Sequence, residues 1–246
     1  MHRFFLQQDL NKDDEISLNK DLSHQVINVL RMNEGDKFEL FNNTEKYFLS
    51  EIIFKQNNVV NCKILDEFIV NKKNVKINVF QSIIKSAKME LIIEKLTEIG
   101  ISSFNPIITE RTQKKDVESF SINKLNRLKK ISIESSEQSG KIHLPEINTK
   151  QKIKELDFKN KNTTNIVFYE NIKGAIEINS IDKKIFSQKS ISIFIGPVGG
   201  FSSDEIEFLK NQESLILNLG NTIFKSDTAA IISVSLLKYI IAGTFD

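Results

Sequence analysis

The sequence contains few of the residues that disulfides and metal centres need. Its 246 residues include one cysteine, Cys62, and three histidines, His2, His24 and His143. A single cysteine excludes an internal disulfide and suits a reducing compartment. The scattered histidines and the one thiol do not match the spacing of a zinc site. We therefore expect no metal, with an all-oxygen site as the open alternative.

Long apolar runs are also absent. The longest, residues 229–237, is interrupted by serine and is shorter than the ~20 apolar residues that span a bilayer. The first nine residues contain no apolar core of a signal peptide. Apolar residues make up 40% of the chain and charged residues 27%, as in globular proteins. We expect one large domain or two modest ones, no membrane partner and a cytoplasmic location.

Charge is distributed unevenly along the chain. The net charge is +2, yet residues 71–154 carry 17 Lys/Arg against 9 Asp/Glu, whereas residues 1–70 carry 8 against 12. A basic segment of this kind indicates a polyanionic partner such as nucleic acid. The alternative is that these lysines form an ordinary solvated surface.

The periodicity of apolar residues changes near residue 75. Before it, a helix is expected at residues 21–30 and short strands at 38–41, 47–54 and 59–65, a pattern typical of a small β-barrel. After it, strands alternate with helices, which predicts a parallel sheet covered on both faces. The expected strands are 75–84, 104–109, 166–169, 191–195 and 214–219. The expected helices are 89–99, 124–139, 174–178, 203–210 and 228–241.

Two further segments complete this organisation. Residues 71–74 (NKKN) are the expected linker between the two parts of the chain. Residues 150–163, rich in lysine and asparagine, are predicted to be an exposed insertion.

Two strands end at glycine turns, residues 196–201 and 219–223. These turns hold four of the nine glycines of the chain. Ligands of open α/β sheets bind at the carboxyl ends of strands, where glycine allows the backbone to approach them closely. The first turn lacks both the P-loop and the G-x-G-x-x-G patterns, which argues against triphosphate and dinucleotide sites.

Several sequence motifs resemble those of the RsmE family of ribosomal RNA methyltransferases, within the SPOUT (trefoil-knotted) superfamily, and they occur in the same order as in that family. The matching segments are residues 3–5 (RFF), 94–100 (EKLTEIG), 109–111 (TER), 134–140 (ESSEQSG), 195–201 (IGPVGGF) and 219–229 (LGNTIFKSDTA). The resemblance covers nearly the whole chain.

The resemblance implies an α/β fold with two domains. A small PUA-like β-barrel RNA-binding domain is expected over residues 1–72, followed by a trefoil-knotted SPOUT methyltransferase domain over residues 73–246. It further implies a homodimer, S-adenosylmethionine as methyl donor, and N3 of a uridine in 16S rRNA of the small ribosomal subunit as acceptor.

The resemblance also implies site residues. Those expected to bind the cofactor are Tyr169, Gly196, Pro197, Gly199, Gly200, Leu219, Gly220, Ile223, Lys225 and Thr228. Those expected to bind RNA are Arg3, Arg31 and Lys85. The catalytic candidates are Gln138, Arg111, Glu137 and Asp227.

The roles of the catalytic candidates follow from the proton on uridine N3, which must leave during methylation. Gln138 can hydrogen-bond the Watson–Crick edge of uracil. Glu137 and Asp227 are possible bases, and Arg111 is a positive partner. Each acid has an ordinary alternative: Glu137 as a solvated or paired helix acid, and Asp227 as a helix N-cap.

The chain departs from the family pattern at two positions. Val198 stands where the family usually has glutamate, and Lys225 stands where it usually has arginine, so the bidentate geometry of arginine is lost. These departures favour a non-catalytic protein as one of two alternatives to uridine-N3 methylation that stay open. One is a SPOUT methyltransferase acting on another RNA position, such as a ribose 2′-hydroxyl of tRNA. The other is a non-catalytic RNA-binding or ribosome-assembly protein.

Overall fold

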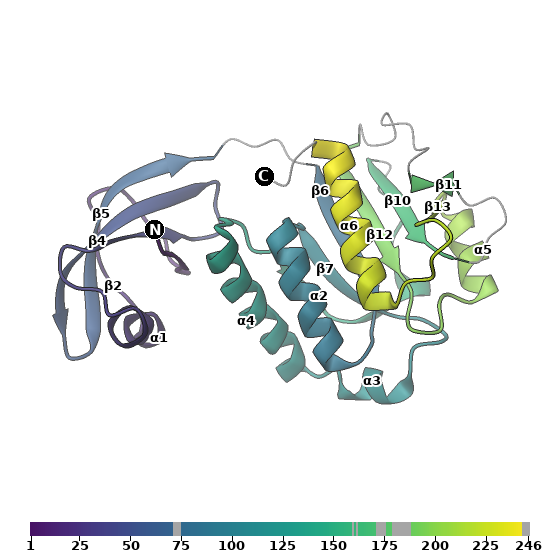
Figure 1. Ribbon diagram of the computed structural model, residues 1–246, viewed down its shortest axis with the longest axis horizontal. Coiled ribbons are helices and arrows are strands. Elements are labelled where there is room, and N and C mark those ends of the chain that lie inside the picture. Colours follow the sequence, from purple (N-terminus) through teal and green to yellow (C-terminus); the bar gives the residue numbers. More distant parts are fainter. Residues whose placement is uncertain (71–74, 159, 161, 171–175, 179–187, 243–246) are drawn as a thin grey trace. The chain divides into compact units, whose positions relative to one another are not determined.

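The computed structural model describes the chain except for residues 71–74, 159, 161, 171–175, 179–187 and 243–246 (Figure 1). It divides into two compact units. The first comprises Met1–Lys72 and Ile133–Leu144, and the second comprises Lys73–Ser132 and Pro145–Asp246. The expected linker lies outside the described residues. Residues 133–144 were expected in the second domain but belong to the first unit, which contains the last part of the helix at residues 122–139.

The first unit is built on a five-stranded sheet in the order β1-β3-β4-β5-β2. Its strands are β1 (Arg3–Phe5), β2 (Glu15–Ser17), β3 (Lys37–Phe41), β4 (Lys46–Gln56) and β5 (Val59–Ile69). The β1–β3 pair is parallel and the other pairs are antiparallel. Alternate side chains such as Phe48 and Ile52 enter the core, so the three strands expected from the sequence are confirmed.

The helix expected at residues 21–30 is divided. It begins as α1 (Lys20–His24), capped by the side chain of Asn19, and continues as the π-helix η1 (Gln25–Val29). The turn widens because Leu30 N–H donates to the carbonyl of Gln25, five residues earlier. Arg31 then adopts a left-handed conformation with φ of 55°, which ends the helix.

The second unit contains an eight-stranded sheet in which every pairing among the described residues is parallel. The main path is β11-β13-β10-β12-β6-β7-β8, and β9 pairs with β7. The strands are β6 (Lys76–Ser82), β7 (Ser103–Ile108), β8 (Glu146–Ile147), β9 (Gln151–Lys152), β10 (Thr163–Phe168), β11 (Ile176–Glu177), β12 (Ser190–Ile195) and β13 (Leu215–Asn218). The parallel sheet expected from the sequence is confirmed.

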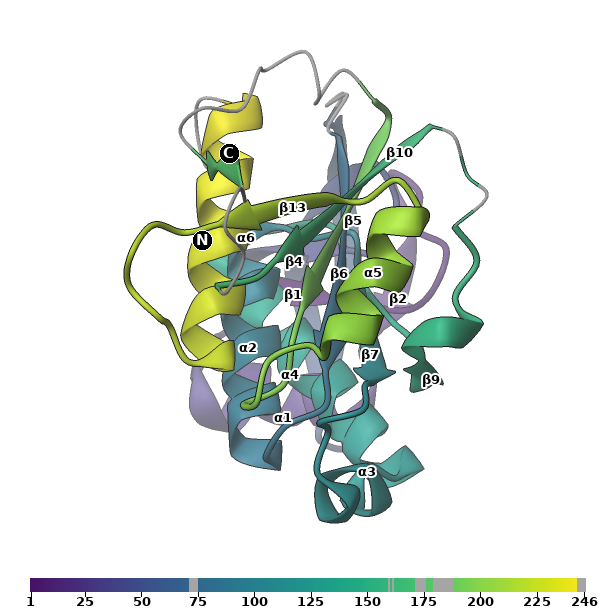
Figure 2. The same cartoon turned by 90° about the vertical axis from the view of Figure 1, so that its right-hand side faces the viewer.

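Helices cover both faces of this sheet (Figure 2). On one face lie α2 (Ser86–Ile99), α6 (Ser226–Ala242) and the first part of α4 (Ile122–Ser139), over a core that includes Ile92 and Val234. On the other face α5 (Ser203–Asn211) packs through Ile206 and Leu209. The short helix α3 (Lys114–Ser119) precedes α4.

Two sequence expectations for this unit are wrong. A helix was expected at residues 174–178, but Ile176 and Glu177 form β11, and residues 174–175 lie outside the described residues. The segment after residue 150 is not simply an exposed insertion, because Ile153, in the short helix η2 (Ile153–Glu155), is 2% exposed. Leu156 and Phe158 pack against the same core. Apolar side chains among the lysines hold this segment on the sheet.

Within the described part of the chain, no helix is both long enough and apolar enough to cross a membrane. In that same part, no three His, Cys, Asp or Glu side chains gather in a way that would hold a metal ion.

Candidate functional site

The topology of the second unit brings the predicted cofactor residues to one edge of the sheet. Strands β13, β10 and β12 are parallel neighbours, so their carboxyl ends meet there. The first glycine turn follows β12, the second follows β13, and Tyr169 follows β10. Tyr169 N–H donates to the carbonyl of Leu217 at 2.9 Å, which extends the pairing to the edge. The two turns expected to form one site therefore flank the same strand.

The first turn, residues 196–201, is crowded at two of its glycines. Gly200 has a φ of +69°, and a Cβ there would lie 3.1 Å from Glu170 Oε1 and 3.9 Å from the ring of Tyr169. A Cβ on Gly196 would lie 3.2 Å from the nitrogen of Phe201. Gly200 N–H also donates to the carbonyl of Pro197 at 3.0 Å. The turn thus packs against Tyr169 and Glu170.

Arg111, predicted to be catalytic, contacts this turn directly. It lies in the loop between β7 and α3, and its Nη1 donates to the carbonyls of Gly199 at 2.9 Å and Phe201 at 3.3 Å. The β-carbon and δ-carbon of Arg111 also lie 3.5 Å from the place of a Cβ on Gly199. In this position Arg111 holds the backbone of the turn.

The buried carboxylate of Glu205 ties the same two loops together. Glu205 is 1% exposed. Its Oε2 accepts from Ser202 N–H at 2.9 Å, and its Oε1 accepts from Glu110 N–H at 2.8 Å. Ser202 Oγ accepts in return from Glu205 N–H at 3.2 Å, which completes a capping box at the start of α5. Sequence reasoning identified this helix start but missed the bond to Glu110, a residue 95 positions away.

The second turn is connected to the first through Ser226, the first residue of α6. Ser226 Oγ donates to the carbonyl of Gly196 at 2.6 Å. The Nε2 of Gln81, a buried residue near the end of β6, donates to Ser226 Oγ at 3.0 Å. Gly220, in the second turn, has a φ of +93°, and among the described residues other than its two chain neighbours no atom lies within 4 Å of the place of a Cβ. Gln81 and Ser226 are further site residues that the sequence pattern did not reveal.

Asp227 is the second residue of α6 and forms an ion pair with Lys88 of α2. The Nζ of Lys88 lies 2.8 Å from Oδ1 of Asp227. Burial opposes ionisation of Asp227, but the Lys88 ammonium and the N–H groups of Asp227 and Thr228 outweigh it, so the pKa of Asp227 lies below its ordinary value. Asp227 is therefore a fixed anion beside the second turn.

Glu137 and Gln138 lie in the first unit, near the end of α4. The Oε1 of Glu137 accepts from Phe5 N–H at 3.0 Å. Burial, with a smaller contribution from Glu134, raises the pKa of Glu137 although the bond from Phe5 opposes the rise. Gln138 is exposed. Asp227 and Arg111 belong to the second unit, so the four catalytic candidates are divided between the units.

The three predicted RNA-binding residues have different surroundings. Arg3 forms an ion pair with Glu39 at 2.6 Å, donates to the carbonyl of Gly140 and lies over the ring of Tyr47. Arg31 and Lys85 are exposed. Arg3 therefore has a structural role in the first unit, and RNA binding by all three residues stays a prediction.

The tips of the two glycine turns are exposed. Val198 and Ile223 are both 72% exposed, and Lys225 is also exposed. Leu219 and Thr228 are partly buried. The site thus combines tight backbone turns with aliphatic side chains open to solvent.

Comparison with known proteins places this arrangement in a family. The family profile described as RNA methyltransferase domain matches residues 71–238. The ribosomal RNA small subunit methyltransferase E of Buchnera aphidicola (Schizaphis graminum) is 31% identical over 238 residues, covering 96% of this chain and 95% of the relative. The protein of the same name from Rickettsia conorii is also 31% identical, over 243 residues with the same two coverages.

Solved structures agree with these sequence relatives. A methyltransferase from Legionella pneumophila in complex with S-adenosylmethionine superimposes with a TM-score of 0.85 at 26% identity, over 96% of both chains. The small subunit methyltransferase E of Neisseria gonorrhoeae, bound to S-adenosylmethionine, shares the fold with a TM-score of 0.88 at 23% identity, over 98% of both chains. This chain belongs to the RNA methyltransferase family, among relatives that carry the name ribosomal RNA small subunit methyltransferase E.

Proposed function

We propose that this protein transfers the methyl group of S-adenosylmethionine to N3 of a uridine in 16S rRNA of the small ribosomal subunit. The observation that carries the proposal is the pair of glycine turns beside β10, in a chain that matches the named methyltransferases over nearly their full length. The related structure from Legionella pneumophila contains the same cofactor.

The residues of the two turns suit S-adenosylmethionine. An adenosyl group needs a largely apolar slot with a few backbone hydrogen bonds. Leu219 and Ile223 supply aliphatic surface, and the space beside Gly220 leaves its backbone accessible. Tyr169, Gly196, Pro197, Gly199, Gly200, Lys225 and Thr228 complete the proposed binding set. When bound, the cofactor supplies an electrophilic methyl group.

The protein's contribution to the reaction is alignment and control of the proton on N3. Asp227, with its lowered pKa, is a weak base and suits electrostatic positioning. Glu137, with its raised pKa, is the better proton acceptor of the two acids. Gln138 is proposed to hydrogen-bond the uracil edge. Arg111 supports the cofactor turn from the side of the α3 loop.

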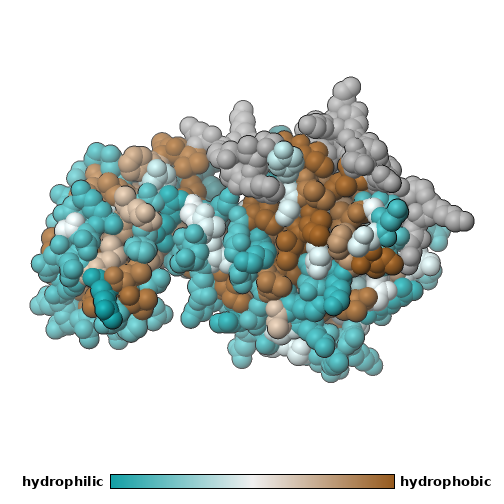
Figure 3. Space-filling model, in the orientation of Figure 1, coloured by the Kyte–Doolittle hydropathy of each residue, from teal (hydrophilic) through white to brown (hydrophobic). Residues whose placement is uncertain are grey.

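We also propose the trefoil knot and the homodimer that the family resemblance implies. The segment after β13 would pass through a loop of the second unit. The dimer proposal is supported by exposed apolar side chains on α6, where Leu236 is 39% and Tyr239 56% exposed, and on α2, where Leu91 is 41% exposed. Figure 3 shows this apolar surface over α6 and α2. A buried dimer interface would cover it.

The first unit is proposed to be the PUA-like RNA-binding barrel, with Arg31 exposed for contact. Lys85 would contact RNA from the second unit. An rRNA substrate implies that the protein works in the cytoplasm.

A second candidate function is RNA binding without turnover. It is favoured by Val198, which leaves the tip of the first turn without the carboxylate usual in the family. Glu170, whose Oε1 lies against Gly200, provides a carboxylate beside the same turn and weakens this alternative.

The test is transfer of labelled methyl from S-adenosylmethionine to small ribosomal subunits that lack the modification, followed by nucleoside analysis. Label in 3-methyluridine is expected. Label in another nucleoside would show that the acceptor is not uridine N3, whereas the proposed cofactor would stand. Cofactor binding without any label would favour the non-catalytic candidate.

A further inference from the structure

The basic charge of the chain is concentrated in the second unit. By composition, the first unit contains 10 Lys/Arg against 14 Asp/Glu, whereas the second contains 24 against 18. The densest part is residues 114–130, with six Lys/Arg and two Asp/Glu. This stretch forms α3 and the first half of α4.

Five of the six cations of this stretch are exposed to solvent, and Lys124 is partly buried. In α4, Leu125, Leu128 and Ile131 enter the core of the second unit, so the opposite face is turned outward. Lys129 and Lys130 are exposed on α4, and Lys114 and Lys115 are exposed at the start of α3. We name Lys114, Lys115, Lys124, Arg127, Lys129 and Lys130 the α3–α4 basic surface.

Several lysines of this surface have no acidic partner within the part of the chain that the structure describes. No ion pair there involves Lys114, Lys115 or Lys129. Arg127 lies 3.5 Å from Glu90 but its side chain is 53% exposed. Positive charges near the start of a helix are electrostatically unfavourable, so the position of Lys114 and Lys115 does not serve helix stability.

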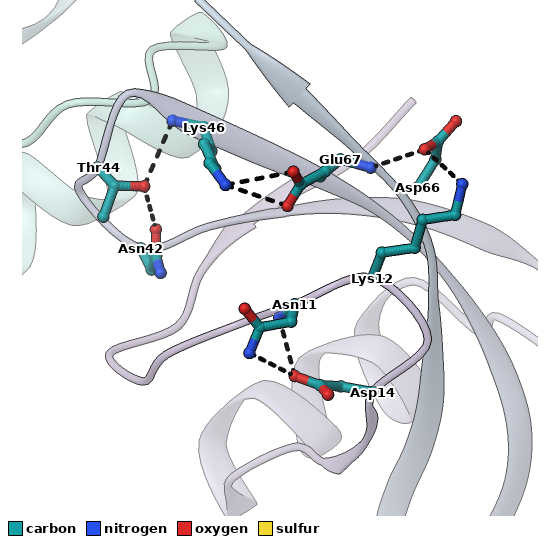
Figure 4. A network of polar contacts seen from close by, with 8 residues as sticks. All are labelled: Asn11, Lys12, Asp14, Asn42, Thr44, Lys46, Asp66 and Glu67. Carbon is teal, nitrogen blue, oxygen red and sulfur yellow. Dashed lines mark hydrogen bonds and ion pairs between the residues drawn. The ribbon is translucent and has the colours of Figure 1, made fainter.

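In the first unit, by contrast, several lysines form ion pairs with acidic side chains. Lys12 lies 3.1 Å from Asp66, and Lys46 lies 3.2 Å from Glu67 (Figure 4). Lys37 pairs with Glu51. Paired lysines in a net acidic unit attract a polyanion weakly.

The α3 end of the α3–α4 basic surface lies at the same sheet edge as the glycine turns. Strand β7 is parallel to β6, which is parallel to β12, so α3 follows the carboxyl end of β7 at that edge (Figures 1 and 2). Arg111, three residues before α3, contacts Gly199 of the first turn. Arg111, Lys114 and Lys115 therefore carry positive charge from the first turn to the start of α3.

We propose that the α3–α4 basic surface is the docking surface for the phosphate backbone of the RNA substrate, and that the second unit supplies most of the electrostatic affinity. The inference rests on the proposed function for the identity of the RNA. Lysines neutralise phosphates and release counterions, so each contact adds to the salt dependence of binding.

The test compares two triple variants of the full chain for binding to purified small ribosomal subunits over a range of salt concentrations. One is Lys114→Gln/Lys115→Gln/Lys129→Gln. The matched control is Lys12→Gln/Lys20→Gln/Lys37→Gln, which removes the same charge from the first unit. Affinity for S-adenosylmethionine, expected to be unchanged in both, verifies that the variants are folded.

The first variant is expected to bind at least about tenfold more weakly at low salt. Its negative slope of log affinity against log salt should become shallower by roughly 2–3, because each of the three lost phosphate contacts contributes ~0.7–0.9. The control is expected to keep the wild-type slope. A shallower slope in the control but not in the first variant would overturn the proposal, as would a wild-type protein that binds no RNA. RNA bound through this surface without methyl transfer would refute the proposed activity and leave the docking surface standing.

Discussion

Gly200 has a backbone conformation that L side chains rarely adopt, and a Cβ there would crowd Glu170. Its φ is +69°, a region that costs an L-residue about 1–2 kcal/mol, and a Cβ would lie 3.1 Å from Glu170 Oε1. Gly200→Ala is therefore expected to lower the free energy of unfolding by about 1–2 kcal/mol in urea denaturation. Gly199→Ala is the matched control, because its Cβ would meet Arg111 at an ordinary 3.5 Å. Equal losses in the two variants would contradict this account.

A substitution of Arg111 can distinguish its predicted catalytic role from its observed role of supporting the first glycine turn. Arg111→Ala removes the hydrogen bonds to the carbonyls of Gly199 and Phe201. Because these bonds are partly exposed, their loss is expected to weaken S-adenosylmethionine binding by about 1 kcal/mol, roughly fivefold, in calorimetry. Arg127→Ala, at an exposed arginine of α4, should leave cofactor affinity unchanged. A lower kcat with unchanged cofactor affinity would instead assign Arg111 to catalysis.

Glu137 should make the protein less stable as the pH rises, which is the opposite of the usual effect of an acidic side chain. Burial raises its folded-state pKa above the ordinary 4.5. The stability that this group contributes is therefore fully present below pH 4.5 and is lost as the pH rises through the folded-state pKa. Glu137→Gln keeps an acceptor for Phe5 N–H but cannot ionise. The free energy of unfolding of wild type minus that of Glu137→Gln is expected to fall as pH rises from about 4 to 7 in urea titrations. A difference that stays constant or rises would contradict the raised pKa.

At the scale of elements, Glu205 joins α5 to the loop after β7. Its carboxylate accepts from two backbone N–H groups in different segments, and an amide would place its NH₂ against one of these donors. Glu205→Gln is expected to cost about 2–4 kcal/mol of unfolding free energy, because a buried donor loses its partner. Glu207→Gln, at an exposed position of the same helix, should change stability by less than about 0.5 kcal/mol. Similar effects in both would mean that the bond to Glu110 contributes little.

Helix α6 carries exposed apolar side chains that suit the proposed homodimer interface. Its residues Leu236 and Tyr239 expose apolar surface at positions where a helix of a monomer usually carries polar side chains. The exposed apolar side chains on this face are therefore the ones to change in a test of the dimer.

At the scale of the whole molecule, the wild-type chain is expected to have twice its 28.2 kDa mass in light scattering after size-exclusion chromatography. Leu236→Lys/Tyr239→Lys should shift the mass to that of one chain, because two desolvated lysines are incompatible with an apolar interface. Phe54→Lys, at a residue of the first unit that is 42% exposed, is the control and should remain dimeric. A monomeric wild type would contradict the proposed homodimer.

The elements that the sequence predicted well are those with a strong local signal. In β4, Phe48 and Ile52 alternate with outward residues, and in α2, Ile92, Ile93 and Leu96 recur at helical spacing. Strands β1, β2, β8, β9 and β11 have three residues or fewer, too few to show a period, and they exist through pairing with distant strands. Ile153 was misassigned because its burial depends on the distant sheet beneath it.

The sequence by itself determined the family, the alternation of strands and helices in the second unit, and the two glycine turns, because each depends on a local pattern of neighbouring residues. The tertiary structure decided what those residues contact. Arg111 hydrogen-bonds to Gly199, 88 positions away, and Glu205 hydrogen-bonds to Glu110, 95 positions away. Arg3 hydrogen-bonds to Glu39. Hydrogen bonds and burial depend on which strand ends become neighbours, and that adjacency is a property of the folded sheet rather than of any local pattern.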